Sequence, residues 1–200
     1  MAAQANRTTL PLFPLSTVLV PRGQLQLRIF ERRYLDMIRD CARTGGGFGV
    51  CLILKGHEVG EPALPAAVGT EARIVDFHHR DDGLLGILAE GGERFRVTQT
   101  RVRSDGLVTG DVERWEPEGT CAVPVEFALL QTIAERLIEN MAPHWRHASP
   151  SMYEDASWLG FRLAELLPLE PGEQQRMLEI THPMLRLAEL RDLLPRFQKA

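Results

Sequence analysis

The hydrophobic and polar positions in the first quarter of the chain follow the two-residue period of β-strands, with one helical interruption. Residues 10–13 and 17–20 are short apolar runs ahead of prolines, which push the preceding residue away from helical backbone. Residues 24–28 alternate and predict a half-buried strand, and the continuous apolar run 48–54 predicts a strand buried on both faces. Between them, residues 30–41 place apolar side chains on one helical face, so we expect a single helix there.

Residues 68–114 predict a series of long antiparallel strands. Two alternating segments flank Asp81, Asp82 and Gly83, and an Asp-Gly pair between such segments is a strong hairpin signal. A second turn is expected at residues 104–106, followed by another strand. Together with the earlier strands, these segments predict a small, partly closed antiparallel β-barrel with one inserted helix.

The hydrophobic period becomes helical in the second half of the chain. Residues 127–141 predict one long helix, and residues 151–167 predict a second helix that a proline ends. Pro171 suits the first turn of a third helix, and Thr181 is the expected N-cap of the last one. We therefore expect the second half to form a helical bundle.

The change of period divides the chain into two expected subdomains within an α+β fold. The boundaries are residues 8–118 for the β-barrel and residues 119–198 for the helical bundle. A chain of 200 residues is long enough for two small subdomains. Its apolar fraction of 44% and charged fraction of 25% are those of an ordinary globular protein.

The apolar N-terminal run fits neither an export signal nor a membrane anchor. A signal peptide needs an unbroken apolar segment of about 7–15 residues, and here prolines and a serine interrupt the run. A membrane-spanning helix needs about 20 consecutive apolar residues, and no such segment is found. The 3 cysteines lack a paired spacing and suit reduced thiols. We therefore expect a cytoplasmic protein that does not bind membranes.

Residues for catalysis or cofactor binding are sparse. The glycine cluster at residues 45–49 follows a predicted helix and precedes a strand, which is the reverse of a phosphate-binding loop. Lysine occurs only at Lys55 and Lys199, and neither setting favours the general base of a Ser–Lys dyad. The histidine pairs lack further ligands in a metal-binding pattern: His78, His79, His144 and His147. We expect no catalytic residue, no cofactor and no metal.

Charge argues against a nucleic-acid partner. The net charge is −4, whereas nucleic-acid-binding domains usually present a basic face. Arg94, Arg96, Arg101 and Arg103 alternate along one predicted strand and turn and could contact phosphates. Acidic residues close in sequence favour instead a solvated, charge-balanced surface.

Five segments in order resemble the N-terminal domain of Lon proteases: LPLFPLSTVLVPRGQLQLRIFERRYLDMI, FGVCLI, VGTEARIVDF, GGERFRV and WLGFRLAELLPLEPGEQQRMLE. The chain is most similar to stand-alone bacterial proteins made of that domain. The resemblance implies a PUA-like β-barrel with one helix, joined to a C-terminal helical bundle. In Lon proteases this domain helps to recognise protein substrates and to assemble the hexamer, while the ATPase and protease domains follow it. The resemblance therefore implies no enzymatic activity for this chain.

The function implied by the resemblance is a non-catalytic protein- or peptide-binding module linked to protein quality control. We expect its contact surface at the apolar, proline-rich edge near the N-terminus: Leu19, Pro21, Leu25, Leu27 and Phe30. The alternative is that these side chains only pack the barrel against its helix. Expected partners are unfolded or partly folded protein segments or one specific protein, and a homodimer stays open. The alternative function is RNA binding by the PUA-like barrel, which the acidic charge opposes.

Overall fold

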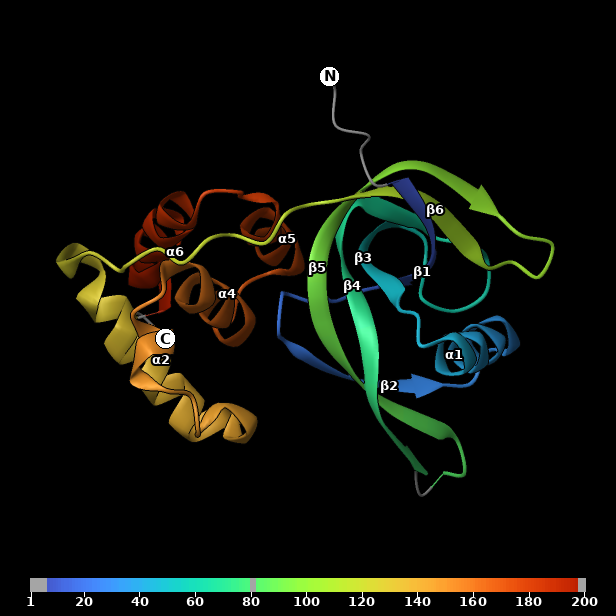
Figure 1. Ribbon diagram of the computed structural model, residues 1–200, viewed down its shortest axis with the longest axis horizontal. Coiled ribbons are helices and arrows are strands. Elements are labelled where there is room, and N and C mark those ends of the chain that lie inside the picture. The colour runs from blue at the N-terminus through green and yellow to red at the C-terminus, as the bar shows by residue number, and fades with distance from the viewer. Residues whose placement is uncertain (1–6, 80–81, 198–200) are drawn as a thin grey trace. The chain divides into compact units, whose positions relative to one another are not determined.

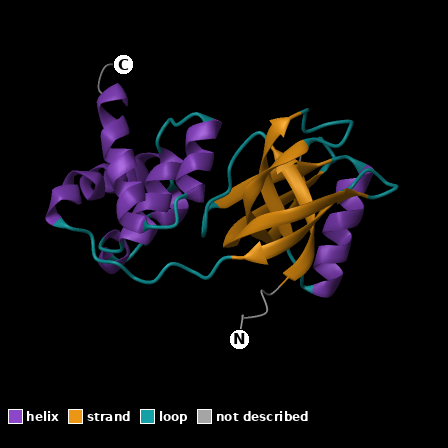
Figure 2. Cartoon of the chain, turned by 90° about the horizontal axis from the view of Figure 1, so that it is seen from above, coloured by secondary structure: helices purple, strands orange, loops and turns teal. Residues whose placement is uncertain are grey.

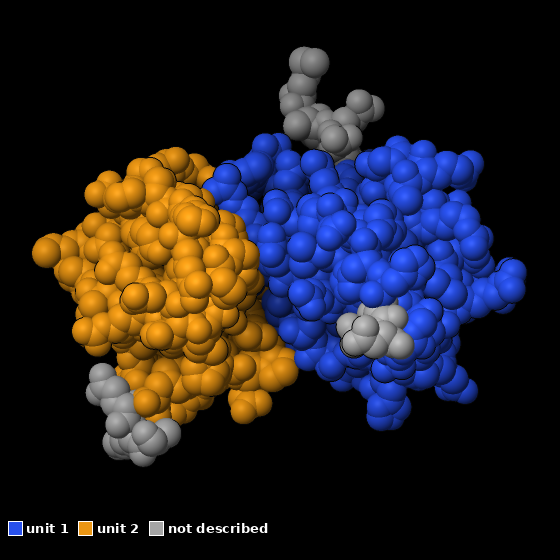
Figure 3. Space-filling view, turned by 90° about the horizontal axis from the view of Figure 1, so that it is seen from below, with its two compact units in different colours: residues 1–117 blue, residues 118–200 orange. Residues whose placement is uncertain are grey.

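The computed structural model describes residues 7–79 and 82–197, so the expected turn residue Asp81 and Lys199 lie outside the described residues. The chain forms two compact units, residues 1–117 and 118–200 (Figure 3). In the described part of the chain, the first unit contains all the strands and one α-helix, and the second consists of helices (Figure 2). The α+β class predicted from the sequence is confirmed.

The first unit is built on a six-stranded sheet with the order β2-β5-β4-β3-β1-β6. β5 also pairs with β6, so the pairings return to β5 and join five strands into a ring that β2 extends at one edge. The longest strands of this ring are β4 and β5, with 16 and 18 residues (Figure 1). The strands are β1 (Arg7–Leu15), β2 (Gln24–Ile29), β3 (Phe48–Lys55), β4 (Leu64–His79), β5 (Leu85–Val102) and β6 (Val108–Arg114).

Strand β1 differs from the prediction in two ways. The chain forms one strand through Pro11 and Pro14, while residues 17–20 form none. β1 pairs with β6 over its first part and with β3, in parallel, over its second part. Each proline therefore sits where the strand has only one partner, and a missing N–H can be accommodated on the other side. The predicted partly closed antiparallel barrel is confirmed only in part, because the β1–β3 pair is parallel and the sheet is not a clean barrel.

Helix α1 (Arg32–Thr44) packs along one side of the strands (Figure 2). Its predicted apolar face is confirmed, because Tyr34, Met37, Ile38 and Cys41 are buried with sheet residues in one cluster. Gly45 ends the helix with a φ of 68°, in the left-handed region that glycine adopts at low cost. The helix covers the sheet beside β2, where the candidate site lies.

The second unit has its own core and five α-helices among the described residues. The helices are α2 (Ala128–Met141), α3 (Pro150–Tyr153), α4 (Ala156–Leu166), α5 (Pro171–Glu179) and α6 (Pro183–Phe197). Two short 3-10 turns, η1 (Val125–Phe127) and η2 (Pro143–Trp145), precede α2 and α3. No helix in the described part of the chain is both long and apolar enough to cross a membrane.

Two helix boundaries differ from the sequence prediction. The expected helix at residues 151–167 is divided into α3 and α4 at Asp155, whose carboxylate accepts a hydrogen bond from the Ser157 N–H at 3.2 Å. This is an N-cap, and it restarts the helix. Helix α6 begins at Pro183, so Thr181 is not its N-cap. Proline at the first helical position explains the later start.

A buried arginine lies among the apolar side chains in the core of the second unit. Arg186 is fully buried and donates from Nη1 to the Glu118 carboxylate at 3.0 Å and from Nε to the Met177 carbonyl at 3.0 Å. Its guanidinium also lies 3.7 Å from the centre of the Phe161 ring. These contacts compensate the charge, because a buried cation is stable only when it is paired and hydrogen-bonded.

Candidate functional site

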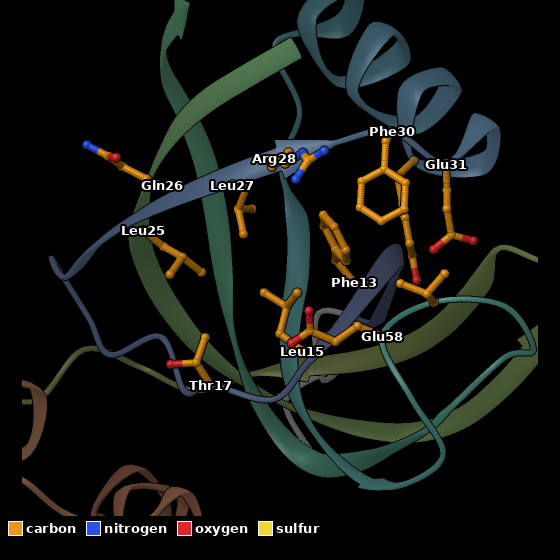
Figure 4. A pocket seen from close by; sticks show the side chains of 12 residues that line it. Phe13, Leu15, Thr17, Leu25, Gln26, Leu27, Arg28, Phe30, Glu31 and Glu58 are labelled. Carbon is orange, nitrogen blue, oxygen red and sulfur yellow. The ribbon is translucent and has the colours of Figure 1, made fainter. Parts of the chain in front are cut away.

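A hollow of about 350 Å³ opens beside β2 in the first unit (Figure 4). This volume lies in the range of small-ligand pockets. Four segments supply its lining: the end of β1 and the residues after it, β2, the start of α1, and the connection between β3 and β4. The lining residues are Phe13, Leu15, Thr17, Leu25, Gln26, Leu27, Arg28, Phe30, Glu31, Tyr34, Glu58 and Val59.

Aromatic and aliphatic side chains form the walls of the hollow. The rings of Phe13 and Tyr34 are stacked, with 4.0 Å between their centres, and both are buried. Leu15 and Leu27 are also buried, whereas Phe30 is 48% exposed. An exposed phenyl ring beside a buried apolar wall offers apolar surface to a partner at little cost to folding.

The hollow runs along an edge of β2. Consecutive side chains of a strand point to opposite faces, and Figure 4 shows Leu25 and Leu27 directed toward the hollow and Gln26 away from it. Four consecutive residues of β2, 25–28, nevertheless line it. A hollow can touch all four only where it reaches the strand backbone. In the described part of the chain β2 pairs with β5 alone, so its other edge offers main-chain donors and acceptors.

Two carboxylates and a phenol add polar groups to this apolar surface. The Glu58 carboxylate accepts from the Ser16 N–H at 2.6 Å and from the Ser16 hydroxyl. Glu31 forms an ion pair with Arg33 at 3.0 Å. Burial raises the pKa of the Tyr34 hydroxyl; Arg33 opposes this shift, and both carboxylates add to it. The hydroxyl therefore stays protonated at neutral pH and can donate a hydrogen bond.

Arg28 is the cation in the lining, and it has a partner outside the hollow. Its guanidinium lies 3.3 Å from the Asp82 carboxylate and 5.8 Å from the centre of the Phe30 ring. The pair is half exposed, so the charges are screened by solvent. The site as a whole combines apolar walls, a strand edge and a few charged groups at its rim.

The structure distributes the predicted site residues between the hollow and the core. Leu25, Leu27 and Phe30 line the hollow. Leu19 is only 4% exposed and belongs to the core of the first unit, and Pro21 is half-buried in the turn before β2. Neither Leu19 nor Pro21 is among the lining residues. The prediction missed the lining residues from other segments: Phe13, Leu15, Thr17, Tyr34, Glu58 and Val59.

The arginines of β5, and Arg103 directly after it, are engaged locally. Arg101 pairs with Asp111 at 2.7 Å, and Arg103 pairs with Asp105 at 3.0 Å, as the charge-balanced interpretation predicted. Arg94 is buried rather than solvated, and its guanidinium lies 4.9 Å from the centre of the Trp115 ring. These contacts do not make the strand an open basic face.

The histidine and cysteine positions show no metal-ligand constellation in the part of the chain that the structure describes. His78 and His79 are neighbours at the end of β4, and His144 lies in η2. Within residues 7–79 and 82–197 there is no group of three or more His, Cys, Asp or Glu side chains that could hold a metal ion.

Comparison with known proteins identifies the type of domain. Residues 9–196 match the family model described as the ATP-dependent protease La (LON) substrate-binding domain. A crystal structure of a Lon N-terminal domain protein from Xanthomonas campestris is similar, with 45% identity and a TM-score of 0.78, over 92% of this chain and 98% of that one. The N-terminal domain of Mycobacterium avium complex Lon protease has the same fold at 16% identity, with a TM-score of 0.62 over 92% and 97% of the two chains.

Curated relatives are longer proteins. A Lon protease from Trichlorobacter lovleyi is 28% identical over 94% of this chain and 24% of its own length. A LON peptidase N-terminal domain and RING finger protein from Schizosaccharomyces pombe is 24% identical over 89% of this chain and 43% of its own length. The chain thus spans about a quarter of one relative and less than half of the other.

Proposed function

The chain belongs to the ATP-dependent protease La (LON) substrate-binding domain family, and we propose that it is a non-catalytic module that binds extended segments of unfolded protein. The observation that carries the proposal is the apolar hollow along the unpaired edge of β2. The family description names substrate binding, and the hollow is a surface on which a polypeptide substrate can lie.

Binding at this site would use two kinds of contact. The open edge of β2 supplies main-chain hydrogen bonds to a segment in extended conformation, as in strand addition. The hollow then receives the side chains on one face of that segment, against walls such as Phe13 and Phe30. Burying one leucine-sized side chain contributes about 1.5–3 kcal/mol. A hollow of this size therefore suits weak, exchangeable binding, because affinity would rest on a few side chains.

The role we propose is substrate recognition in protein quality control, in the cytoplasm. The relatives that carry this domain include a Lon protease and a RING finger protein, and in each it is one part of a longer chain. We therefore propose that this domain binds the substrate and has no catalytic role of its own. Its partners would be unfolded or partly folded protein segments.

The test is binding of a fluorescently labelled apolar peptide, measured by anisotropy, to the wild type and to Phe30→Asp. Phe30 is half exposed and lines the hollow, so the charge should weaken binding at least about tenfold while the melting temperature changes little. Leu54→Asp is the matched control, because Leu54 is 62% exposed and lies outside the lining. Equal peptide binding by wild type and Phe30→Asp would contradict the proposed site.

A further inference from the structure

We propose that the hollow selects segments in which a lysine or arginine lies two residues from an apolar side chain. The inference rests on the proposed function and adds the chemical class of the substrate. It starts from Glu58, a carboxylate in the lining whose charge has no cationic partner among the described residues.

The charged groups around the hollow differ in how they are compensated. Glu31 pairs with Arg33 at 3.0 Å, and Arg28 lies 3.3 Å from Asp82. Glu58 instead accepts only from the backbone N–H and hydroxyl of Ser16, which are neutral donors. Those two bonds orient the carboxylate at the rim and leave its negative charge uncompensated. A cationic side chain of the bound segment would supply the missing charge.

Aromatic rings stand beside this carboxylate. Figure 4 shows the Glu58 carboxylate near Leu15 and Phe13, and Glu31 beside Phe30. The pKa of the Tyr34 hydroxyl is raised first by burial, and the negative charges of Glu31 and Glu58 add to that shift. Apolar walls also focus the field of a nearby charge, because they exclude the solvent that would screen it.

The protein itself stacks arginine on the aromatic rings of this region. The Arg33 guanidinium lies 4.7 Å from the centre of the Tyr34 ring, and that of Arg28 lies 5.8 Å from the centre of the Phe30 ring. Phe30 remains half exposed, so part of its ring is open to a partner. Lysine and arginine pack their methylene stems on apolar surface while the charged head stays near water or a carboxylate.

The strand edge fixes the spacing of the two side chains. A segment added to β2 is extended, so residues i and i+2 point to the same face and lie about 6.6–6.8 Å apart. If an apolar side chain enters the hollow between Leu25 and Leu27, a basic side chain two residues along can lie against the aromatic end. The same segment with an acidic residue there would be repelled by Glu58.

The experiment compares three labelled peptides that differ at one position, apolar-x-Arg, apolar-x-Gln and apolar-x-Glu, by anisotropy at low salt. The arginine peptide should bind at least about fivefold more tightly than the glutamine peptide, and the difference should shrink in 1 M salt. Glu58→Gln keeps an acceptor for Ser16 and should reduce the ratio toward one. Glu61→Gln should keep the ratio, because Glu61 is exposed in the same connection and outside the lining.

Each outcome decides a different point. Equal binding of the arginine and glutamine peptides would overturn the inference and leave the proposed function standing. An arginine preference that survives Glu58→Gln would overturn it as well, because a group other than Glu58 would then recognise the peptide's arginine. Absence of binding by all three peptides would overturn the proposed function itself. Thermal unfolding of both variants should show that they remain folded, because both substitutions are at exposed side chains.

Discussion

At the scale of the residue, Arg22 occupies a backbone conformation that suits glycine. Its φ is 62°, and it follows Pro21 in a turn closed by a 2.9 Å hydrogen bond from the Gly23 N–H to the Val20 carbonyl. A turn with proline second and a positive φ third is of type II, which normally has glycine or asparagine there. The Arg22 N–H also donates to the Gly91 carbonyl at 2.7 Å, so the turn is tied to β5 just before β2 begins.

Arg22→Gly should raise the free energy of unfolding by about 0.5–1 kcal/mol. Glycine removes the left-handed penalty, and this gain exceeds the entropy that glycine adds to the unfolded chain. Urea unfolding of the two proteins measures the difference. Arg22→Ala is the control, because alanine removes the side chain and keeps the strain, so it should not be stabilising. A stabilisation of equal size in both variants would assign the effect to the side chain and contradict the backbone explanation.

At the scale of the element, helices α5 and α6 are joined by a charged clamp. Glu173 lies in the first turn of α5, where its carboxylate accepts from the Glu170 N–H at 2.9 Å. The same carboxylate receives both Nη groups of Arg196 in the last turn of α6. These hydrogen bonds, that of Arg196 first, lower the pKa of Glu173 to about 2. The clamp thus holds α6 against α5 through the carboxylate of Glu173, which loses its charge only in acid.

The clamp predicts a loss of stability in acid. Because the pKa of Glu173 falls from 4.5 to about 2 on folding, its contribution is present above about pH 4.5 and is lost as the pH falls toward 2. Arg196 is half exposed and Glu173 is partly exposed, so solvent screens the pair, and the effect should be small and weaker in high salt. Urea midpoints measured by circular dichroism between pH 6 and pH 2.5 should fall more steeply for the wild type than for Glu173→Gln. Parallel curves would contradict the assignment.

Most elements were predictable because their signals are local. The apolar period of α1 and the turn at Gly83, whose φ is 77°, depend on residues close in sequence. The first strand was predicted to end at Phe13, because Pro14 is expected to break a strand, whereas β1 continues to Leu15. Pairing on one side at a time overrides that effect, and it depends on β3 and β6, which are distant in sequence. The lining of the hollow follows the same division: Leu25 and Phe30 were predicted from their local pattern, whereas Glu58 comes from a remote connection that only the fold places beside them.

At the scale of the whole molecule, each unit has a core of its own. The core of the second unit consists of residues between Phe127 and Leu194, and those of the first unit contain residues between Leu10 and Val112. Arg186 and Glu118 form their buried pair inside the second unit. Removing one member of such a pair leaves an uncompensated charge and costs about 3–5 kcal/mol.

Arg186→Met should therefore destabilise the second unit selectively. Hydrogen exchange followed by mass spectrometry should show faster exchange in α2, α4 and α6, with the strands of the first unit unchanged. Arg176→Met is the control, since Arg176 forms an exposed pair with Glu189 and its loss should cost less than about 1 kcal/mol. Equal loss of protection in both units would show that they unfold as one cooperative body.

The pairing of β1 with β6 has a consequence for biosynthesis. Thr9 and Asp111 are hydrogen-bonded across 102 residues of sequence, so β1, which precedes the other described strands of its unit, is completed by the last of them. At about 5–20 residues per second, the nascent chain waits roughly 5–20 s for that partner. During this interval Leu10 and Leu12, which share a buried cluster with Val108 and Val112 in the finished fold, lack the cover of β6. A translational pause before residue 108 would prolong that exposure and with it the period in which the nascent chain can aggregate or recruit a chaperone.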